Sequence, residues 1–358
     1  MRVLVLWAND TSSNLGVRAL AQGTTDLVSS ALPDAEVTRV HYGPGPAPVR
    51  IGDWHRLVRE RMSRSSELLA WLSDFDLAID TRAGDSFADL YGLERLATQS
   101  LLAELTREAG TPLVLGPQTI GPFDSRRGKG LGRWSLRRAT AVMARDSVSA
   151  EYARSIGRPV DALTTDVVFA LARPPRGNEY DVLLNISGLL WAENTHVDSL
   201  RYRTTVLEVA RGLLRAGRTV GLLAHVLDSP VADNDVPAVT EAAQLLDDPR
   251  VSVVVPDSLE DVRRITASAR LVIGSRMHAC LNALSTGTPA VPLAYSRKFE
   301  PLLNDLGWKH TVDLRDGDNP VPKVLALAES DLEAEVGGVV DTADALLDVA
   351  RNTLRSLE

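Results

Sequence analysis

The sequence predicts an α/β protein made of two Rossmann-like domains, with parallel sheets that face a central cleft. Short apolar runs alternate with amphipathic helical segments along most of the chain, which is the pattern of βαβ units. A Pro/Gly-containing linker, Pro174–Glu179, interrupts this pattern, and strand periodicity restarts at Val182. The 358 residues are enough for two cores. We therefore expect domains at 1–173 and 180–335, and a terminal helix within 338–358 that can pack back on the first domain.

The bulk composition is that of an ordinary globular protein. Hydrophobic residues make up 44% of the chain and charged residues 24%, and the formal net charge is −8. This acidity argues against a general nucleic-acid or membrane-surface binder, so an anionic ligand would have to be held by a local cluster of arginines. Cys280 is the only cysteine, which excludes an internal disulfide and a cysteine-based metal site. No stretch reaches transmembrane length and no signal peptide is recognisable, so we expect a cytoplasmic protein.

The first domain is expected to begin with a strand almost at the first residue of the chain. Gly16 is the only glycine between this strand and the first helix, so the dinucleotide fingerprint GxGxxG is absent. The arginine-rich segment 126–138 predicts a solvated basic helix, and Asp146 or Ser147 can cap the helix that follows. We expect strands at 2–7, 37–41, 77–80, 112–115, 141–144 and 161–166, and helices at 15–30, 53–72, 93–108, 126–138 and 147–156.

The second domain repeats the alternation after the linker. Polar residues, among them Asn185 and His225, follow its strands, as is common at a ligand-binding sheet edge. Ser275 can cap the helix after the fourth strand, and Gly287 and Pro289 end that helix. We expect strands at 182–186, 219–224, 251–255, 271–273, 290–293 and 310–314, and helices at 200–215, 236–246, 259–267, 277–285, 298–306 and 341–357.

The stretch from Leu271 to Lys298 is the one around which the chain is organised. An apolar stripe on its helix faces the core (Met277, Cys280, Leu281 and Leu284), while His278, Asn282 and Ser285 lie on another face. Arg276 and His278 would sit where the helix begins, at the carboxyl edge of the sheet. The helix N-terminus and the guanidinium fork favour an anionic ligand there. The alternative is a structural salt bridge for Arg276 and a helix-start polar role for His278.

Polar side chains also follow three strands of the first domain. The loop after the third strand is glycine-rich, and Gly-Pro units fix the loop after the fourth. Loops of this kind at strand ends often line ligand-binding sites. Arg145 follows the fifth strand, but it could instead pair with Asp146 or Asp166. The remaining candidates from these loops are Asp85, Ser86, Asp89, Tyr91 and Gln118.

Four segments occur in an order and spacing that resemble the polysaccharide pyruvyl transferase family. They are GDSFADLYG at 84–92, GPQTIGPF at 116–123, ARD at 144–146 and GSRMHACLNALSTGTPAVPLAY at 274–295. The most specific part is the Ser-Arg-Met-His turn with the following helix and Gly-Thr-Pro. The resemblance extends from about Asn14 to Gly307. It implies a GT-B-like fold and the transfer of pyruvate from phosphoenolpyruvate onto a sugar as a ketal.

The resemblance implies that Arg276 and His278 are active-site residues and that Arg145 is a second donor-binding arginine. We expect His278 to be the main acid/base residue, with His225 as its rival. Ser275 and Asn282 are assigned to the donor side. The residues assigned to the acceptor side are Asp85, Ser86, Asp89, Tyr91 and Gln118.

The expected partners are phosphoenolpyruvate, as co-substrate, and a saccharide or lipid-linked saccharide acceptor, with no nucleic acid. No metal or other cofactor is required for the reaction. One position departs from the family pattern, in which the early motif often reads Asn-x-Gly-Asp. Here Val17 follows Gly16, so an acidic residue has no role at this position, and the acceptor can differ.

Two alternative functions remain open at this point. A sugar-nucleotide glycosyltransferase of GT-B architecture would usually carry an acidic residue in the helix after the anion-binding turn, but residues 277–285 contain none. The other alternative is a non-catalytic family member. Arg145, Arg276 and His278 count against it, whereas Val17 counts mildly for it.

Overall fold

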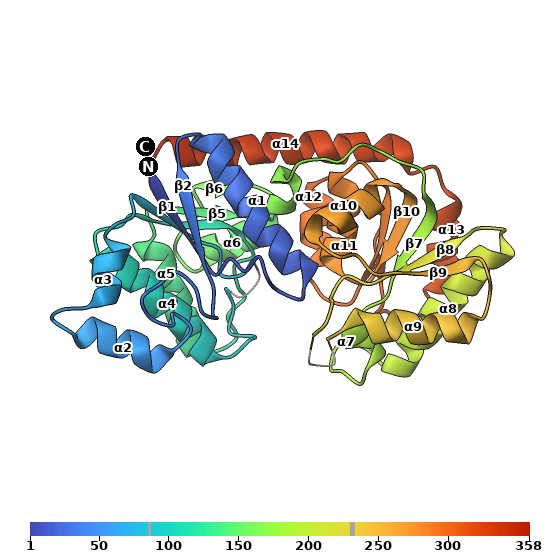
Figure 1. The fold of residues 1–358 in the computed structure, drawn as a ribbon, viewed down its shortest axis with the longest axis horizontal. Coiled ribbons are helices and arrows are strands. Elements are labelled where there is room, and N and C mark those ends of the chain that lie inside the picture. Colours follow the sequence, from blue (N-terminus) through green and yellow to red (C-terminus); the bar gives the residue numbers. More distant parts are fainter. Residues whose placement is uncertain (85–86, 230–232) are drawn as a thin grey trace. The chain divides into compact units, whose positions relative to one another are not determined.

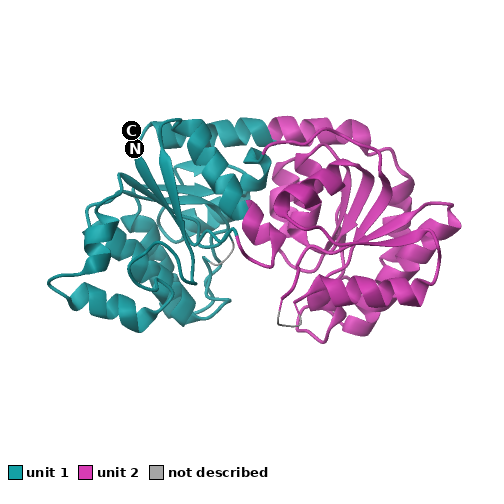
Figure 2. Cartoon of the chain, viewed as in Figure 1, with its two compact units in different colours: residues 1–10, 20–171, 343–358 teal, residues 11–19, 172–342 magenta. Residues whose placement is uncertain are grey.

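The computed structural model describes residues 1–84, 87–229 and 233–358, and it divides into two compact units (Figures 1 and 2). Unit 1 comprises residues 1–10, 20–171 and 343–358, and unit 2 comprises residues 11–19 and 172–342. Within the described residues each unit contains a six-stranded parallel sheet with helices packed on it. The predicted α/β class with two Rossmann-like units is confirmed.

Unit 1 has the strand order β2–β1–β3–β4–β5–β6. The inner strands carry almost only buried side chains, as expected for a parallel sheet covered on both faces. α2, α4 and α5 pack side by side, and α1 lies on the other side of the sheet (Figure 1). The elements are β1 Arg2–Leu6, α1 Leu15–Ala31, β2 Glu36–Val40, α2 Trp54–Met62, α3 Glu67–Leu72, β3 Leu77–Asp80, α4 Leu93–Glu108, β4 Leu113–Gln118, α5 Arg126–Arg138, β5 Ala141–Ala144, α6 Ser147–Ser155, β6 Ala162–Leu163 and the 3-10 turn Val167–Ala170.

Unit 2 has the strand order β12–β11–β10–β7–β8–β9. β8 and β11 are buried along their whole length, and β7 and β10 between them are buried over most of theirs. The predicted apolar stripe of α11 lies in the core, apart from the partly exposed Met277. The elements are β7 Tyr180–Asn185, α7 Gly188–Trp191, α8 Ser199–Arg215, β8 Val220–Leu223, α9 Asp235–Leu246, β9 Val251–Val254, α10 Leu259–Ala267, β10 Ala269–Gly274, α11 Met277–Ser285, β11 Ala290–Ala294, α12 Phe299–Asp305, β12 Val312–Asp313, α13 Val321–Glu329 and α14 Glu333–Arg355.

The strand order of unit 2 places a topological switch point between β7 and β10. The chain runs outward from β7 to β9 and returns on the other side of β7, where Asn185 pairs in register with Gly274. Ligands of open α/β sheets bind outside the carboxyl ends of the strands at such a point. Ser275 and Arg276 follow β10 at this edge, as the sequence analysis expected.

Four features of the helices differ from the sequence prediction. The single helix expected at 53–72 is two helices, because Ser66 caps α3 and its hydroxyl donates to the buried Glu60 carboxylate at 2.8 Å. The helices α7 and α13 were not predicted. The last helix begins at Glu333 rather than near 341, and its part from Ala343 onward, more than half of the helix, groups with unit 1, where Arg351 Nε donates to Ser30 Oγ at 3.1 Å.

Residues 11–19 were placed in the first domain by the sequence analysis, but they group with unit 2. Asn14 forms an antiparallel bridge with Val226, and the Leu15 amide donates to the His225 carbonyl at 3.1 Å. The start of α1 is therefore part of the unit that carries Arg276. In the part of the chain that the structure describes, no helix combines the length and apolarity needed to cross a bilayer.

Candidate active site

The turn after β10 is held by neighbouring strands and by α8. The Arg276 amide donates to Asn185 Oδ1 at 2.8 Å, and Asn185 Nδ2 donates to the Leu223 carbonyl at 2.9 Å. Ser275 does not cap α11, because its hydroxyl accepts a hydrogen bond from Tyr202 at 2.8 Å, and Arg276 is the N-cap residue. Ser275 is fully buried, so its hydrogen bond with Tyr202 stabilises the turn from the interior of unit 2.

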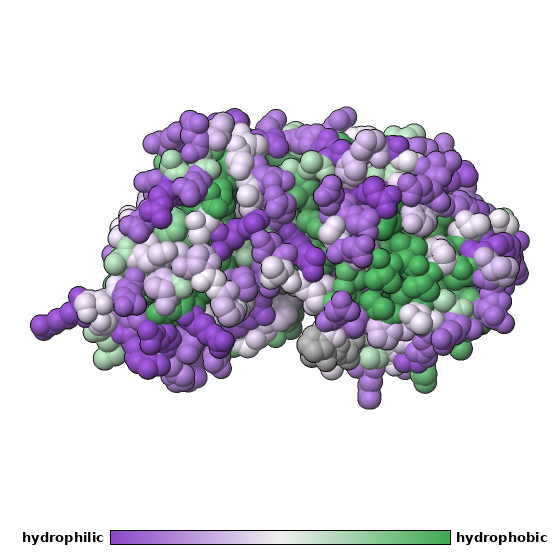
Figure 3. All heavy atoms as spheres, viewed as in Figure 1, coloured by the Kyte–Doolittle hydropathy of each residue, from purple (hydrophilic) through white to green (hydrophobic). Residues whose placement is uncertain are grey.

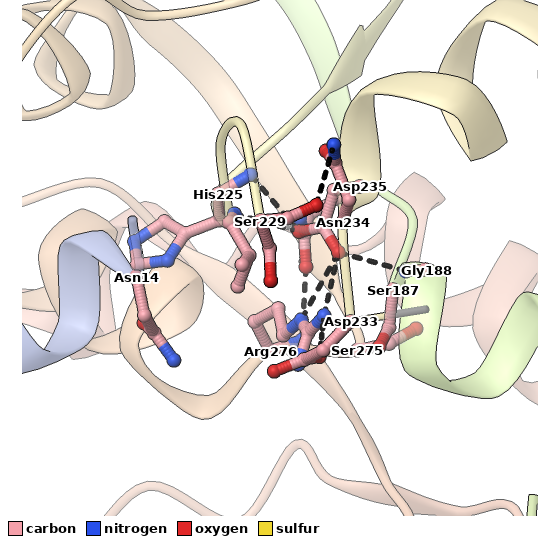
Figure 4. Close-up of polar contacts among 12 residues, drawn as sticks. Asn14, Ser187, Gly188, His225, Ser229, Asp233, Asn234, Asp235, Ser275 and Arg276 are labelled. Carbon is pink, nitrogen blue, oxygen red and sulfur yellow. Dashed lines mark hydrogen bonds and ion pairs between the residues drawn. The ribbon is translucent and has the colours of Figure 1, made fainter. Parts of the chain in front are cut away.

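Arg276 is locked by two carboxylates at this edge (Figure 4). Its Nε and Nη2 donate to Asp235 Oδ1 at 3.2 and 2.6 Å, and Nη2 also lies 2.5 Å from Asp233 Oδ1. Burial alone would lower the pKa of Arg276, but Asp235 and Asp233 raise it above its ordinary value. The salt bridge that the sequence analysis gave as the alternative for Arg276 is therefore present. A role in donor binding stays a prediction.

Asp235 is the residue that the sequence analysis missed in this site. Its Oδ1 also accepts from the Gly188 amide at 2.7 Å, and its Oδ2 accepts from the His225 and Val226 amides at 3.0 Å each. The fully buried carboxylate thus joins the loops after β7, β8 and β10. The sequence signal was an acid at a helix start directly after the capping Asn234, a pattern that usually marks only a solvated helix end.

The amide of Asn282 joins a buried arginine to a buried histidine. Arg263 Nη1 donates to Asn282 Oδ1 at 3.1 Å, and Asn282 Nδ2 lies 3.1 Å from His225 Nε2. Because a guanidinium only donates, the amide oxygen must face Arg263 and the NH₂ must face His225. His225 Nε2 is therefore the acceptor, and Nδ1 carries the proton. Burial, with His278 and Arg276 nearby, lowers the pKa of His225 well below its ordinary value.

This network separates the two candidate histidines. His225 is buried and stays neutral at physiological pH, so it is unsuited to take up and release a proton there. His278 lies in the first turn of α11 and is partly exposed. Asn282, which the sequence analysis assigned to the donor side, is fully buried and binds Arg263 and His225.

His278 packs directly against the first turn of α1. A Cβ added at Gly16 would lie 2.8 Å from both Cγ and Nδ1 of His278, which is closer than real Cβ atoms approach. The side chain of Asn14 accepts from the Gly16 amide at 2.9 Å and so fixes the turn. The Asn-x-Gly part of the early motif therefore shapes the surroundings of His278, whereas Val17 takes the place of the family's acid.

Replacing Gly16 with alanine is expected to lower turnover at least about tenfold, because the new methyl group must displace His278. Alanine would otherwise stabilise a helix interior by about 0.5–1 kcal/mol. Steady-state kinetics and thermal unfolding measure both effects. Gly338→Ala in α14 is the matched control, since nothing lies within 4 Å of a Cβ there. Parent-like turnover of Gly16→Ala would mean that the position of His278 is not critical.

A cavity of about 180 Å³ lies beside Tyr202, at the carboxyl edge of unit 2. His196, Arg201 and Arg315 are among its lining residues. Both arginines make internal bonds, since Arg201 Nη2 donates to the Asp316 carbonyl at 2.7 Å and Arg315 pairs with Asp313. The cavity can accept a small ligand, but its cations are already used in holding the loop after β12.

In unit 1, Arg145 combines deep burial with spare hydrogen-bond donors. It follows β5, is 1% exposed, and its Nη1 donates to Asp166 Oδ2 at 2.8 Å, which is one of the pairings given as an alternative. Among the described residues, Arg145 Nε and Nη2 have no hydrogen-bond partner. Buried donors without a partner are costly, so a ligand or an ordered water is expected to complete the bonding of these two atoms.

Other buried atoms at the same edge also lack partners among the described residues. They are Gln118 Oε1, Thr119 Oγ1 and Thr165 Oγ1, which follow or end β4 and β6 on either side of β5. Gln118 pairs in register with Ala144, and its Nε2 donates to the Asp80 carbonyl at 3.0 Å. The predicted candidates Gln118 and Arg145 therefore lie on neighbouring strand ends. Thr165 was missed, because threonine after a strand carries no distinctive signal.

The loop after β3 holds four of the residues that the sequence analysis assigned to the acceptor side, and their role in acceptor binding stays a prediction. Asp89 accepts from the Asp124 and Ser125 amides at 2.8 Å each and from the Ser125 hydroxyl at 2.6 Å. These bonds lower the pKa of the Asp89 carboxyl despite the opposing effect of partial burial, and they tie it to the start of α5. Tyr91 is 42% exposed and its ring stacks with Arg95. Asp85 and Ser86 lie outside the described residues.

The comparisons with known proteins agree with the motifs. A family model described as polysaccharide pyruvyl transferase matches residues 14–297. The amylovoran biosynthesis protein AmsJ from Erwinia amylovora is 23% identical over 296 residues, which cover 77% of this chain and 68% of that protein.

Solved structures resemble the chain in fold. The UDP-GlcNAc 2-epimerase of Neisseria meningitidis, bound to UDP-GlcNAc, has a TM-score of 0.59 at 12% identity and covers 100% of this chain and 99% of its own. Anabaena HepE, in complex with UDP and glucose, has a TM-score of 0.52 at 12% identity and covers 99% and 97%. The S. aureus MnaA–UDP structure has a TM-score of 0.58 at 11% identity and covers 98% and 94%. At these identities the similarity establishes the fold alone, and the expected GT-B-like architecture is confirmed.

Proposed function

We propose a pyruvyl transfer function for this chain, because the chain belongs to the polysaccharide pyruvyl transferase family. In the proposed reaction, pyruvate is transferred from phosphoenolpyruvate onto a saccharide as a ketal. The family and the polysaccharide-biosynthesis relative support a transferase that acts in polysaccharide biosynthesis. Phosphoenolpyruvate as the donor and the ketal linkage in the product are the parts of this function that we propose beyond the family assignment. The structural observation that carries them is the buried Arg145, with two guanidinium nitrogens unpartnered among the described residues, at a carboxyl sheet edge.

The chemistry of the proposed reaction defines what the residues must do. Two hydroxyl oxygens of the sugar each form a bond to C2 of phosphoenolpyruvate, and the C2–O bond to phosphate breaks. One hydroxyl proton is delivered to the methylene carbon, which becomes a methyl group, and the other leaves with the phosphate. The enzyme must therefore bind a donor that carries both a phosphate and a carboxylate, move two protons and stabilise the departing phosphate.

Arg145 suits donor binding better than Arg276 in this structure. Arg145 has one ion pair and two spare donor atoms, and these could bind a carboxylate or phosphate as a fork. Arg276 shares its Nη2 between Asp233 and Asp235, so the three residues together carry a net negative charge. A donor that binds Arg276 would have to displace Asp233, which is the more exposed of the two carboxylates.

His278 is the proposed acid/base residue. It is partly exposed in the first turn of α11, whereas His225 is buried and neutral. In this reaction His278 takes a proton from an attacking hydroxyl and returns it to the methylene carbon or to the departing phosphate. The proposal requires no metal ion or other cofactor, because the donor is activated by protonation and by cationic side chains.

The acceptor is proposed to be a saccharide or a lipid-linked saccharide. Gln118 remains a candidate for binding its hydroxyl groups, since Gln118 Oε1 is buried without a partner among the described residues. Asp89 is a weaker candidate than the sequence indicated, because its carboxylate already accepts three hydrogen bonds from the α5 start.

The test combines calorimetry with product analysis. Titration with phosphoenolpyruvate should show binding, whereas UDP-sugars at the same concentration should not. Incubation with phosphoenolpyruvate and a panel of free and lipid-linked saccharides should release phosphate only with the true acceptor, whose mass should increase by one pyruvyl ketal. Binding of UDP-sugars without phosphoenolpyruvate binding would point to the glycosyltransferase alternative. α11 contains no acidic residue, which disfavours that alternative.

A further inference from the structure

Helix α5 has an unusual charge for a helix of an acidic protein. Its 13 residues, Arg126–Arg138, contain six cationic side chains and no acid, whereas the whole chain has a net charge of −8. One face of the helix packs inward, where Gly128 contacts Asp89 and Gly132 contacts Phe123. All six cations lie on the exposed face, namely Arg126, Arg127, Lys129, Arg133, Arg137 and Arg138.

Five of these cations have no carboxylate partner within the described residues. Only Arg138 is paired, with Glu104 of α4 at 2.6 Å, an interaction that helps lower the Glu104 pKa to about 2 against the effect of partial burial. The guanidinium groups of Arg133 and Arg137 lie beside Gly157, after the end of α6. Structural pairing therefore accounts for one cation of six.

An aromatic residue sits among these cations. Trp134 is 37% exposed on the outer face of α5, with Arg138 near its ring. α2, which packs beside α4, ends at Met62, and this residue is 81% exposed. Figure 3 shows strongly hydrophilic side chains over the region of unit 1 in which Figure 1 shows α2 and α4.

We propose that the exposed face of α5 docks on an anionic phospholipid surface. Clustered cations without carboxylate partners are attracted to anionic headgroups, by about fivefold in binding constant for each one. Tryptophan is favoured at the boundary between headgroups and acyl chains, and Trp134 is exposed beside these cations, with Arg138 near its ring. The overall acidity opposes a general polyanion binder, but it leaves this local patch intact.

A membrane fits this face better than a nucleic acid does. The face is the convex side of one helix, with a single exposed tryptophan and no stacked series of aromatic residues. Docking would also bring the enzyme to the same surface as a lipid-linked acceptor. The docking does not depend on pyruvyl transfer, so it can be tested without any substrate.

The experiment is co-sedimentation of the full chain with phosphatidylglycerol-containing vesicles and with pure phosphatidylcholine vesicles. We expect binding to the anionic vesicles only, with affinity that falls as salt is raised. Arg133→Glu/Arg137→Glu should weaken binding by at least about 20-fold, and Trp134→Ala should weaken it several-fold. The matched control is Arg211→Glu/Arg215→Glu, an exposed i, i+4 pair on α8 that changes the net charge equally and should bind as the parent does.

Three results would overturn the proposal. They are equal binding to both vesicle types or to neither, equal losses in the α5 and α8 variants, and tighter binding of a short DNA duplex with the same dependence on Arg133 and Arg137. Thermal unfolding of each variant separates lost docking from lost folding. A parent-like unfolding temperature with lost sedimentation supports docking. Failure here leaves the proposed pyruvyl transfer untouched, since that is measured with soluble substrates.

Discussion

Arg145→Lys is expected to weaken phosphoenolpyruvate binding by about 10- to 100-fold while the protein stays folded. Lysine keeps the charge that Asp166 requires, so no buried carboxylate is left unpaired. It loses the guanidinium fork, and with it the Nε and Nη2 donors that are unpartnered among the described residues. The loss of one charged hydrogen-bonding interaction is worth about 1.5–3 kcal/mol, which corresponds to the expected factor. Calorimetric titration measures it.

Arg218→Lys is the matched control for this variant. Arg218 also forms a close pair with an aspartate, Asp181, but it precedes β8 at the amino edge of its sheet, away from the strand ends that bind ligands. Its replacement should leave donor affinity unchanged. If Arg145→Lys binds phosphoenolpyruvate as tightly as the parent, then the Asp166 pair is the whole function of Arg145, and the donor is bound elsewhere.

Much of the fold could be predicted because the spacing of apolar residues differs between the strands and the helices of an α/β protein. Helices such as Leu93–Glu108 and Arg126–Arg138 were predicted with their observed bounds, since apolar spacing and end signals agree there. The break between α2 and α3 was missed because the apolar spacing continues across it, and the hydrogen bond of Ser66 to Glu60, six residues earlier, is not apparent from that spacing. The assignment of residues 11–19 to unit 2 depends on pairing with Val226, far away in the sequence.

The positions of the candidate-site residues at strand ends could be predicted from the sequence, whereas their hydrogen-bond and ion-pair partners could not. Each of these residues follows or ends a predicted strand, so the sequence placed them at the carboxyl edges of the two sheets. The structure has Arg276 and His278 at the switch-point edge of unit 2, and Arg145 and Gln118 at neighbouring strand ends of unit 1. The sequence could not show that Asp235 holds Arg276, because the two residues are 41 positions apart. Partners of buried polar groups are set by three-dimensional packing, and a sequence pattern does not reveal them.

His278→Gln is expected to lower kcat by about 10²- to 10⁴-fold, the range for loss of general acid–base catalysis, with donor affinity nearly intact. Glutamine keeps similar size and some hydrogen bonding but cannot exchange a proton near neutral pH. His278 lies in the first turn of α11 and is partly exposed as a residue, with its ring packed against Gly16 and its Nε2 atom buried. Steady-state kinetics with the true acceptor, together with calorimetry, separate turnover from binding.

His225→Gln tests the rival histidine in the same assay. The glutamine amide oxygen can accept from Asn282 as His225 Nε2 does, so the buried network survives and kcat should fall far less than in His278→Gln. Because burial holds the pKa of His225 well below its ordinary value, titration of this ring cannot produce a limb of the pH–rate profile near neutrality. His310→Gln, at the exposed pair with Glu335, should behave as the parent. The opposite order, with His225→Gln inactive and His278→Gln within a few-fold of parent turnover, would reduce His278 to a helix-start residue.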